Sequence, residues 1–314
     1  MQPQDFVHPK DFGVKELYLQ HFGVSEFPFS ITPDTSFFFS SGGAKEALTT
    51  LLIAACTGEG FIKITGEVGT GKTLLCRKLM ASLEQDFKVA YIPNPYLEPL
   101  ALFMELASEL EVKIAPRAKP NQHQLLKALT KRLLEIIREG KRVVICIDEA
   151  QAMPTETLEA LRLLTNLETE KRKLLQVVIF GQPELDEKLN HPSIRQLKQR
   201  ITFDYHLNPL SRDELDYYVH HRLGVAGYQG GRLFSPLALW MMQRKTKRIP
   251  RLVNIISHKA MLSAFGKGKR TVGMFDVLAA AKDTASMRKP GMAGKLGFLL
   301  LIIAGCSIGW VYLQ

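Results

Sequence analysis

Short apolar runs alternate with longer amphipathic stretches over the first two thirds of the chain. Runs rich in Ile, Val, Leu and Phe predict strands buried on both faces, at 61–65, 88–92, 142–147, 174–180 and 201–207. Apolar residues that recur every three or four positions predict helices at 44–57, 74–83, 97–110, 124–139 and 156–167, and a short polar helix is expected at 193–200. Strands that alternate with helices predict an α/β fold, in which helices cover both faces of a mostly parallel sheet.

The pattern changes near residue 209, where strand signals nearly vanish. Four amphipathic segments predict a small helical domain over 209–286, at 212–223, 236–244, 250–265 and 274–285. It follows a sheet domain that we place at 43–208. The first 42 residues mix aromatic residues with turn residues such as Pro28 and Pro33, which break any long helix. We expect this extension, 1–42, to pack near the binding site of the sheet domain.

The end of the chain has a composition of its own. Residues 296–313 (LGFLLLIIAGCSIGWVYL) carry no charge, and as a helix these 18 residues would span roughly 27 Å, close to a bilayer core of about 30 Å. A basic linker, 287–295, precedes them. We therefore expect a transmembrane helix at 296–313 with the bulk of the chain in the cytoplasm, because positive charge stays on that side. A buried or partner-covered C-terminal helix is the alternative.

Composition narrows the class of protein. Lys and Arg total 41 against 31 Asp and Glu, a net charge of +10 that suits nucleic acid or an anionic membrane surface. The four cysteines form no C-x-x-C pair, so the sequence indicates neither a zinc site nor a disulfide framework. The N-terminus lacks the basic and apolar regions of a secretory signal. A reducing compartment fits the bulk of the chain.

A phosphate-binding loop lies between the first predicted strand and the helix after it. Its sequence, GEVGTGKT over residues 66–73, has glycines where the backbone must turn tightly enough to aim amide groups at phosphate oxygens. Lys72 can reach the terminal phosphates, and the Thr73 hydroxyl can bind Mg²⁺. We expect nucleotide contacts from Gly66, Glu67, Val68, Gly69, Thr70, Gly71, Lys72, Thr73 and Leu74. No guanine-reading N/T-K-x-D motif is visible, which favours ATP over GTP.

Acidic and amide side chains follow the third and fourth strands. Asp148 and Glu149 stand at the end of the third strand, where Asp148 can hold Mg²⁺ and Glu149 can orient or deprotonate the attacking water. Gln182 follows the fourth strand and can contact the terminal phosphate or that water. These residues predict hydrolysis, although capping and turn roles are the alternatives.

Two arginines outside the phosphate loop are candidates to contact the nucleotide phosphates. Arg200, preferred over Arg195, can project onto the site of a neighbouring subunit and stabilise the charge that develops in phosphoryl transfer. Arg251 follows Ile249-Pro250 at the start of a predicted helix and can reach back to the nucleotide. Plain surface charge is the alternative for both.

The order of GEVGTGKT, VVICIDEAQ, VVIFGQPEL, RQLKQRI and IPRLVN resembles the AAA+ ATPases of the general secretion pathway protein A (ExeA) family. Within that family the chain is similar to the ATPases of mannose-sensitive haemagglutinin (MSHA, MshM-type) type IV pilus biogenesis. The resemblance implies a P-loop NTPase of AAA+ type with a small helical lid. It also implies that Gln182 is the first sensor, Arg200 the arginine finger and Arg251 the second sensor. Arg248 departs from the small residue that relatives commonly have there.

The residues predict a Mg²⁺-dependent ATPase anchored by one C-terminal helix, and the resemblance implies that it lies at the bacterial inner membrane and assembles with other components. The expected cofactors are ATP and Mg²⁺. The expected partners are further copies of the chain in a homo-oligomer, pilus or secretion assembly components, and inner membrane lipid, whereas nucleic acid is not expected. Two alternatives stay open: a DNA-binding AAA+ helper ATPase of the transposition type, and a nucleotide-dependent scaffold with negligible turnover.

Overall fold

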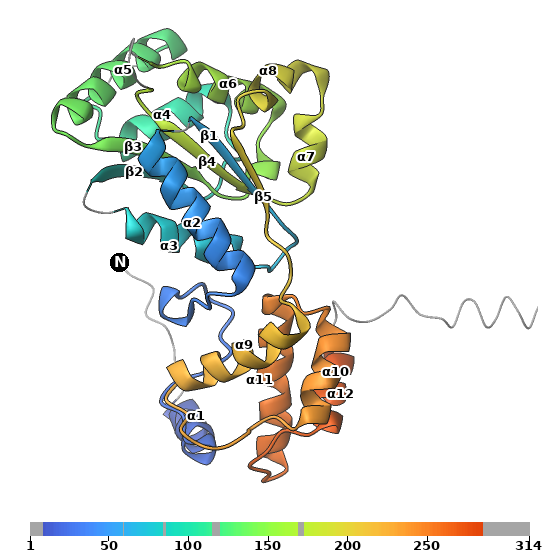
Figure 1. Ribbon diagram of the computed structural model, residues 1–314. Coiled ribbons are helices and arrows are strands. Elements are labelled where there is room, and N and C mark those ends of the chain that lie inside the picture. The colour runs from blue at the N-terminus through green and yellow to red at the C-terminus, as the bar shows by residue number, and fades with distance from the viewer. Residues whose placement is uncertain (1–8, 59, 84–85, 115–119, 169–172, 285–314) are drawn as a thin grey trace, which may run out of the picture.

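The computed structural model describes residues 9–284, except 59, 84–85, 115–119 and 169–172 (Figure 1). The predicted linker at 287–295 and the predicted transmembrane helix at 296–313 lie outside these described residues. Among the helices that are described, none combines the length and the apolar character needed to cross a bilayer.

The sheet has five parallel strands in the order β2-β3-β4-β1-β5. The strands are β1 (Phe61–Thr65), β2 (Phe87–Ile92), β3 (Arg142–Ile147), β4 (Gln176–Gly181) and β5 (Phe203–His206). Thr65 at the end of β1 pairs with Gly181 and with His206, so three strands end together at one edge. The segments that follow these strands therefore meet at this edge, which confirms the expected parallel α/β architecture.

Helices cover both faces of the sheet (Figure 1). One face packs on α2 (Gly42–Thr57) and α3 (Lys72–Ser82), with Ile62, Ile64 and Val178 in the shared core. The other face is covered by α4 (Pro99–Glu109), α5 (Gln122–Arg138), α6 (Thr155–Thr165), α7 (Glu184–Leu189) and α8 (Arg195–Lys198). Short 3₁₀ turns lie at η1 (Thr35–Phe37), η2 (Ala150–Ala152) and η3 (Pro192–Ile194). Neighbouring residues of each strand point to opposite faces of the sheet. Because most of these residues are apolar, both faces of the sheet are apolar.

Element boundaries differ from the predicted ones for local reasons. Helix α5 begins at Gln122 rather than Gln124 because Asn121 caps it, with the Asn121 and Gln124 side chains bonded reciprocally to each other's backbone N–H. Strand β4 begins at Gln176 rather than Leu174, since the Leu174 N–H is bonded to the Leu167 carbonyl instead of the sheet. In both cases a hydrogen bond, not hydrophobic pattern, sets the boundary.

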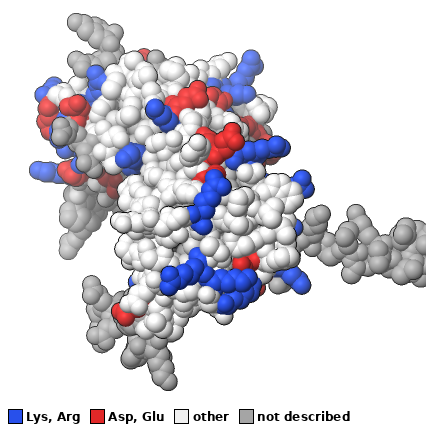
Figure 2. Space-filling view, turned by 60° about the horizontal axis from the view of Figure 1, so that its bottom comes forward, with Lys and Arg blue, Asp and Glu red and all other residues white. Residues whose placement is uncertain are grey.

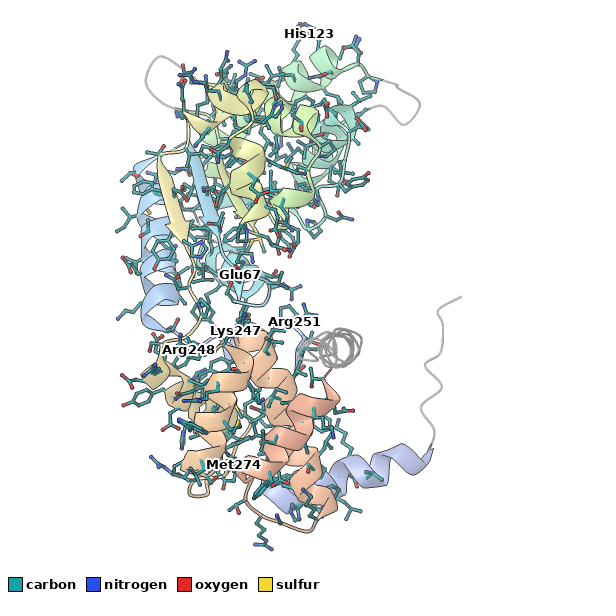
Figure 3. The ribbon with its side chains drawn as sticks, turned by 90° about the vertical axis from the view of Figure 1, so that its right-hand side faces the viewer. Glu67, His123, Lys247, Arg248, Arg251 and Met274 are labelled. Carbon is teal, nitrogen blue, oxygen red and sulfur yellow. The ribbon has the colours of Figure 1, made fainter. Side chains whose placement is uncertain are left out.

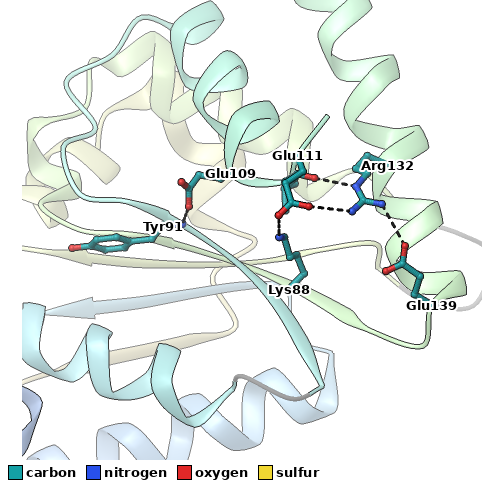
Figure 4. A network of polar contacts seen from close by, with 7 residues as sticks. Lys88, Tyr91, Glu109, Glu111, Arg132 and Glu139 are labelled. Carbon is teal, nitrogen blue, oxygen red and sulfur yellow. Dashed lines mark hydrogen bonds and ion pairs between the residues drawn. The ribbon is translucent and has the colours of Figure 1, made fainter. Parts of the chain in front are cut away.

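The edge strand β2 is fastened to its neighbouring helices by charged side chains (Figure 4). The Glu109 carboxylate accepts a hydrogen bond from the Tyr91 N–H at 2.9 Å, which occupies a donor that an edge strand leaves free. Lys88 donates to Glu111 at 2.7 Å, and Arg132 donates to the Leu110 carbonyl at 3.0 Å. This network joins β2 to α4 and α5.

The helical lid contains α9 (Arg212–Val225), α10 (Pro236–Thr246), α11 (Pro250–Gly266) and α12 (Met274–Asp283). Helix α1 (Pro9–Phe22) packs against it, although Pro28 and Pro33 had led us to expect no long helix in this region. The expectation was wrong for α1 because both prolines come after its end. Tyr18 is buried and its ring lies 5.6 Å from that of Phe265, so the lid supplies the packing that stabilises α1.

Candidate functional site

The phosphate loop joins β1 to α3 in a conformation that requires glycine. Gly69 and Gly71 have φ of 85° and 105°, where a side chain is strained. A Cβ on Gly66 would lie 2.6 Å from the Leu207 carbonyl oxygen, because β5 ends beside the loop. These glycines let the loop curl at the N-terminus of α3, where free backbone N–H groups and the helix dipole favour an anion.

Lys72 is buried in the loop, with 5% of its surface exposed. Its Nζ donates to the carbonyl oxygens of Gly66 at 2.7 Å and Glu67 at 3.0 Å. Burial lowers the pKa of Lys72, and the nearby carboxylates of Glu149 and Asp148 act in the opposite direction. The ammonium group is held by the loop itself, ready to exchange a carbonyl partner for a phosphate oxygen.

Asp148 and Thr73 form a pair of oxygen donors behind the loop. The Asp148 side chain is only 3% exposed and accepts hydrogen bonds from the Thr73 hydroxyl and from the Glu149 N–H. Burial raises the pKa of Asp148, and those hydrogen bonds offset part of the rise. A carboxylate and a hydroxyl that already touch, in a site where negative charge is costly, fit Mg²⁺, which takes oxygen ligands.

Glu149 is held in an unusual position by two glutamines. Its φ is 51°, a left-handed conformation that is costly for a non-glycine residue. Its Oε2 accepts hydrogen bonds from Gln182 Nε2 at 3.0 Å and from Gln151 Nε2 at 2.5 Å. Gln151 in turn accepts a bond from the Gln182 N–H at 3.0 Å, so the ends of β3 and β4 orient this carboxylate together. Gln151 was not predicted from the sequence, although it lies only two positions after Glu149.

The lid reaches the phosphate loop through the start of α11. The Arg251 N–H donates to the Gly69 carbonyl at 3.1 Å, and a Cβ on Gly69 would lie 2.5 Å from the Arg251 Cβ. Two residues just before α11, Lys247 and Arg248, have φ of 50° and 63°. The departure noted at Arg248 thus falls where a small residue would be least strained. Figure 3 shows Lys247, Arg248 and Arg251 gathered at the junction between the domains, below Glu67.

A cleft of about 320 Å³ lies between the sheet domain and the lid. One side, which we call the phosphate wall, is the phosphate loop with Asp148 behind it and Glu149 at its margin. The opposite side, which we call the outer wall, consists of residues 30–34 with Tyr218, Arg222 and Asn254. Residues 30–34 belong to the N-terminal extension and reach the cleft.

A buried hydrogen-bond network holds the outer wall together. Arg222, 5% exposed, donates to the carbonyl oxygens of Pro28 at 2.7 Å and Ser30 at 3.0 Å, and lies over the Phe37 ring at 4.3 Å. The Tyr218 hydroxyl donates to Asn254 Oδ1 at 2.8 Å. Burial lowers the pKa of Arg222. Sequence reasoning expected the extension near the site but did not identify Tyr218, Arg222 or Asn254, although Arg222 interrupts the apolar stripe of a predicted helix.

Arg200 lies far from the cleft of its own chain. It follows α8, and its Nη1 donates to the Thr165 hydroxyl at 3.1 Å. The neighbouring Thr202 N–H donates to the Phe61 carbonyl at the start of β1, whereas the phosphate loop follows the end of that strand. Arg195 is exposed nearby on α8. The structure therefore brings Lys72, Thr73, Asp148, Glu149, Gln182 and Arg251 together at one edge, and leaves Arg200 at the other.

Comparisons with known proteins agree with this geometry. A family model described as AAA domain matches residues 55–189. General secretion pathway protein A of Aeromonas hydrophila is 43% identical over 298 residues, which are 94% of this chain and 53% of that protein. The ATP-dependent target DNA activator B of Escherichia phage Mu is 32% identical over 132 residues, 42% of this chain and 39% of that protein. The chain thus spans about half or less of these relatives.

Solved structures show the same fold. Cdc6p from Pyrobaculum aerophilum matches 80% of this chain and 70% of its own, with a TM-score of 0.64 at 20% identity. The ORC2 protein of Aeropyrum pernix, solved as ADPNP and ADP complexes, matches 82% of this chain and 73% of its own, with a TM-score of 0.59 at 18% identity. Residues 55–189 thus match the AAA domain family model, the chain is similar to general secretion pathway protein A over 94% of its own length, and the solved structures share its fold.

Proposed function

We propose that the protein binds ATP with Mg²⁺ in the cleft and hydrolyses it. The observation that carries this proposal is the Glu149 carboxylate, which Gln182 and Gln151 hold at the margin of the cleft that Lys72 and Thr73 also line. A phosphate site alone binds nucleotide, whereas a carboxylate fixed beside it can orient and deprotonate an attacking water. The similar Aeropyrum structure, solved with ADPNP and ADP, supports nucleotide as the ligand.

Each residue of the phosphate wall has a proposed role. Loop N–H groups and Lys72 bind the β- and γ-phosphates. Thr73 and Asp148 would hold Mg²⁺, which supplies positive charge to the phosphate oxygens. Glu149 takes the proton of the attacking water, and Gln182 keeps Glu149 in place and senses the terminal phosphate. Arg251 joins the site from the lid, whose backbone already contacts the loop at Gly69.

We propose that the active form is a homo-oligomer in which Arg200 of one subunit completes the site of the next. Arg200 lies at the edge of the sheet opposite to its own phosphate loop. From there it can serve a phosphate only across a subunit boundary, where a guanidinium stabilises charge in phosphoryl transfer.

We further propose that the protein acts at the bacterial inner membrane, with 296–313 as its anchor, in assembly of a secretion machine or an MSHA-like type IV pilus. The similarity to general secretion pathway protein A supports the secretion setting, and the uncharged run supports the anchor. The transposition-type alternative has less support, because the phage relative matches only 42% of the chain. A scaffold without turnover would not need a Glu149 held by two amides.

Hydrolysis by the chain truncated after Lys289 tests the proposed activity. Glu149→Gln should bind ATP and lose turnover by about 10²-fold or more, while Lys72→Ala should lose ATP binding. Glu105→Gln, an exposed carboxylate in the middle of α4, is the matched control and should retain normal turnover. Normal hydrolysis by Glu149→Gln would refute the proposed role, and negligible turnover by the unmodified chain would favour the scaffold.

Mixing two inactive variants tests the shared site. Arg200→Ala and Lys72→Ala should each be inactive alone. A mixture should regain activity, because an intact phosphate loop on the first variant can meet an intact Arg200 on the second. Arg195→Ala, which removes the exposed arginine of α8, should behave like the unmodified chain. Failure of the mixture, with both variants folded, would exclude Arg200 as the residue supplied by the neighbour.

A further inference from the structure

The positive charge of the protein is concentrated in the lid. Residues 209–284 contain 13 Lys and Arg against 5 Asp and Glu, so this quarter of the chain carries +8 of the total +10. Figure 2 looks at the molecule from the lid end, where blue Lys and Arg gather in the lower half while blue and red are mixed in the upper half. Nucleotide phosphates use only a few of these charges, since Arg251 and the buried Arg222 are the lid cations that line the cleft.

One face of the lid combines cations with exposed apolar side chains. The Leu237, Trp240 and Phe275 side chains are 62%, 45% and 74% exposed, and the Arg244 guanidinium lies over the Trp240 ring at 4.4 Å. The starts of α10 and α12 are joined by the parallel bridge between Phe234 and Val272, and the helices run side by side from there. We call the exposed stripe on these two helices the lid face: Leu237, Trp240, Arg244, Lys245, Phe275 and Lys282.

Helical geometry places the two kinds of side chain in register. A spacing of seven residues returns to the same side of a helix, so Leu237 and Arg244 share one stripe of α10, and Phe275 and Lys282 share one stripe of α12. In both helices the apolar residue is near the start and the cation near the end. Each of the two neighbouring helices therefore carries an exposed stripe that combines an apolar side chain with a cation.

We propose that the lid face lies on the headgroup region of an anionic lipid bilayer; this rests on the anchoring of 296–313 proposed above. Lys245, Arg244 and Lys282 match anionic headgroups, and Trp240, Leu237 and Phe275 enter the boundary between headgroups and acyl chains, where aromatic side chains are favoured. Leu296 lies 12 positions after Thr284, a length that reaches at most roughly 40 Å. An anchored chain thus keeps α12 close to the membrane.

Lipid fits this surface better than nucleic acid does. Binding to the phosphates of a duplex needs only the cations of this surface. The three large apolar side chains would stay exposed to water in such a complex. A bilayer uses both parts of the surface. The cation-π contact also places the Arg244 charge beside the Trp240 ring, so both can reach the interface together.

Tryptophan fluorescence tests the proposal on the full chain, because Trp240 and Trp310 are its two tryptophans. Trp310→Phe leaves Trp240 as the reporter of the lid face, and Trp240→Phe leaves Trp310 as the reporter of the anchor. Each variant is placed in nanodiscs of phosphatidylcholine alone or with phosphatidylglycerol, with and without lipids brominated near the headgroup end of the acyl chain. Trp240 quenching by bromine should be at least about two-fold greater in anionic than in neutral discs.

Two charge variants sharpen the test. Lys245→Gln with Lys282→Gln, which leaves Arg244 on Trp240, should reduce Trp240 quenching to the level seen in neutral discs. Lys127→Gln with Lys131→Gln, two exposed lysines on α5 of the sheet domain, should leave it unchanged.

The outcomes separate this inference from the proposed anchor. Quenching of Trp310 without quenching of Trp240 overturns the lid face and leaves the anchor standing. Absence of quenching at both positions overturns both. A response of Trp240 to added duplex DNA, with none to anionic lipid, identifies the lid face as a nucleic-acid surface and overturns the lipid proposal.

Discussion

The two walls of the cleft affect the empty protein in opposite ways. The phosphate wall contains a left-handed Glu149 and a buried Asp148 whose pKa is raised, and both disfavour the folded state without a ligand. The outer wall contains hydrogen bonds from Arg222 and Asn254 that join the N-terminal extension to the lid, and one from Tyr218 to Asn254 that joins α9 to α11. The candidate site residues thus lie on the strained phosphate wall, whereas the outer wall contributes hydrogen bonds that stabilise the fold.

The largest effect is expected from Arg222→Ala. The change leaves the Pro28 and Ser30 carbonyls without their buried donor and opens a gap beside Phe37, so the free energy of unfolding should fall by about 2–4 kcal/mol. Nucleotide affinity should fall as well, because residues 30–34 lose their support. Urea unfolding and nucleotide titration measure the two losses. Arg232→Ala, at an exposed arginine of the lid, should change stability by less than about 0.5 kcal/mol.

Gly69→Ala adds only one methyl group, but it should reduce both the stability of the phosphate loop and its binding of nucleotide. A side chain at this φ costs about 1–2 kcal/mol, and the new Cβ would meet the Arg251 Cβ at 2.5 Å. We expect loss of nucleotide binding together with this destabilisation, measured by titration and by thermal unfolding. Gly224→Ala, in α9 with open space around it, should instead stabilise by about 0.5–1 kcal/mol. Equal behaviour of the two variants would contradict the strain assigned to the loop.

Arg248→Gly should raise the free energy of unfolding by about 0.5–1 kcal/mol, because glycine adopts the φ of 63° without strain. Arg248→Ala removes the same side chain but keeps a Cβ, so it should show no such gain. A gain in both variants would assign the effect to the charge rather than to the backbone.

Asp148→Asn should give the smallest change in stability, and its sign should depend on pH. Since burial raises the pKa of Asp148 above its ordinary 3.8, the unmodified chain keeps this carboxyl's contribution at low pH and loses stability as pH rises through the raised value. The variant lacks that loss, so without ligand it should be the more stable form at neutral pH. With Mg²⁺ and ATP the order should reverse. Unfolding curves across a pH series, with and without ligand, measure both.

The residues of the phosphate wall were predictable from the sequence, whereas the side chains that hold the extension to the lid in the outer wall were not, for a physical reason. The loop at 66–73, Asp148, Glu149 and Gln182 each follow a strand, and parallel strands bring such positions to one edge. The outer wall joins Ser30 to Arg222 and Asn254 across more than 190 positions of chain, and no local pattern encodes that pairing. Helix α1 was missed for a similar reason, because Tyr18 and Phe22 are buried by the lid rather than by neighbours in sequence.

The contact between Arg251 and Gly69 is made by main-chain atoms, N–H to carbonyl. Side-chain substitution at position 251 can therefore change what reaches the nucleotide without severing this link between lid and loop. Only proline, which has no N–H, removes the donor. The main-chain link between α11 and the phosphate loop is therefore independent of the side-chain chemistry at position 251.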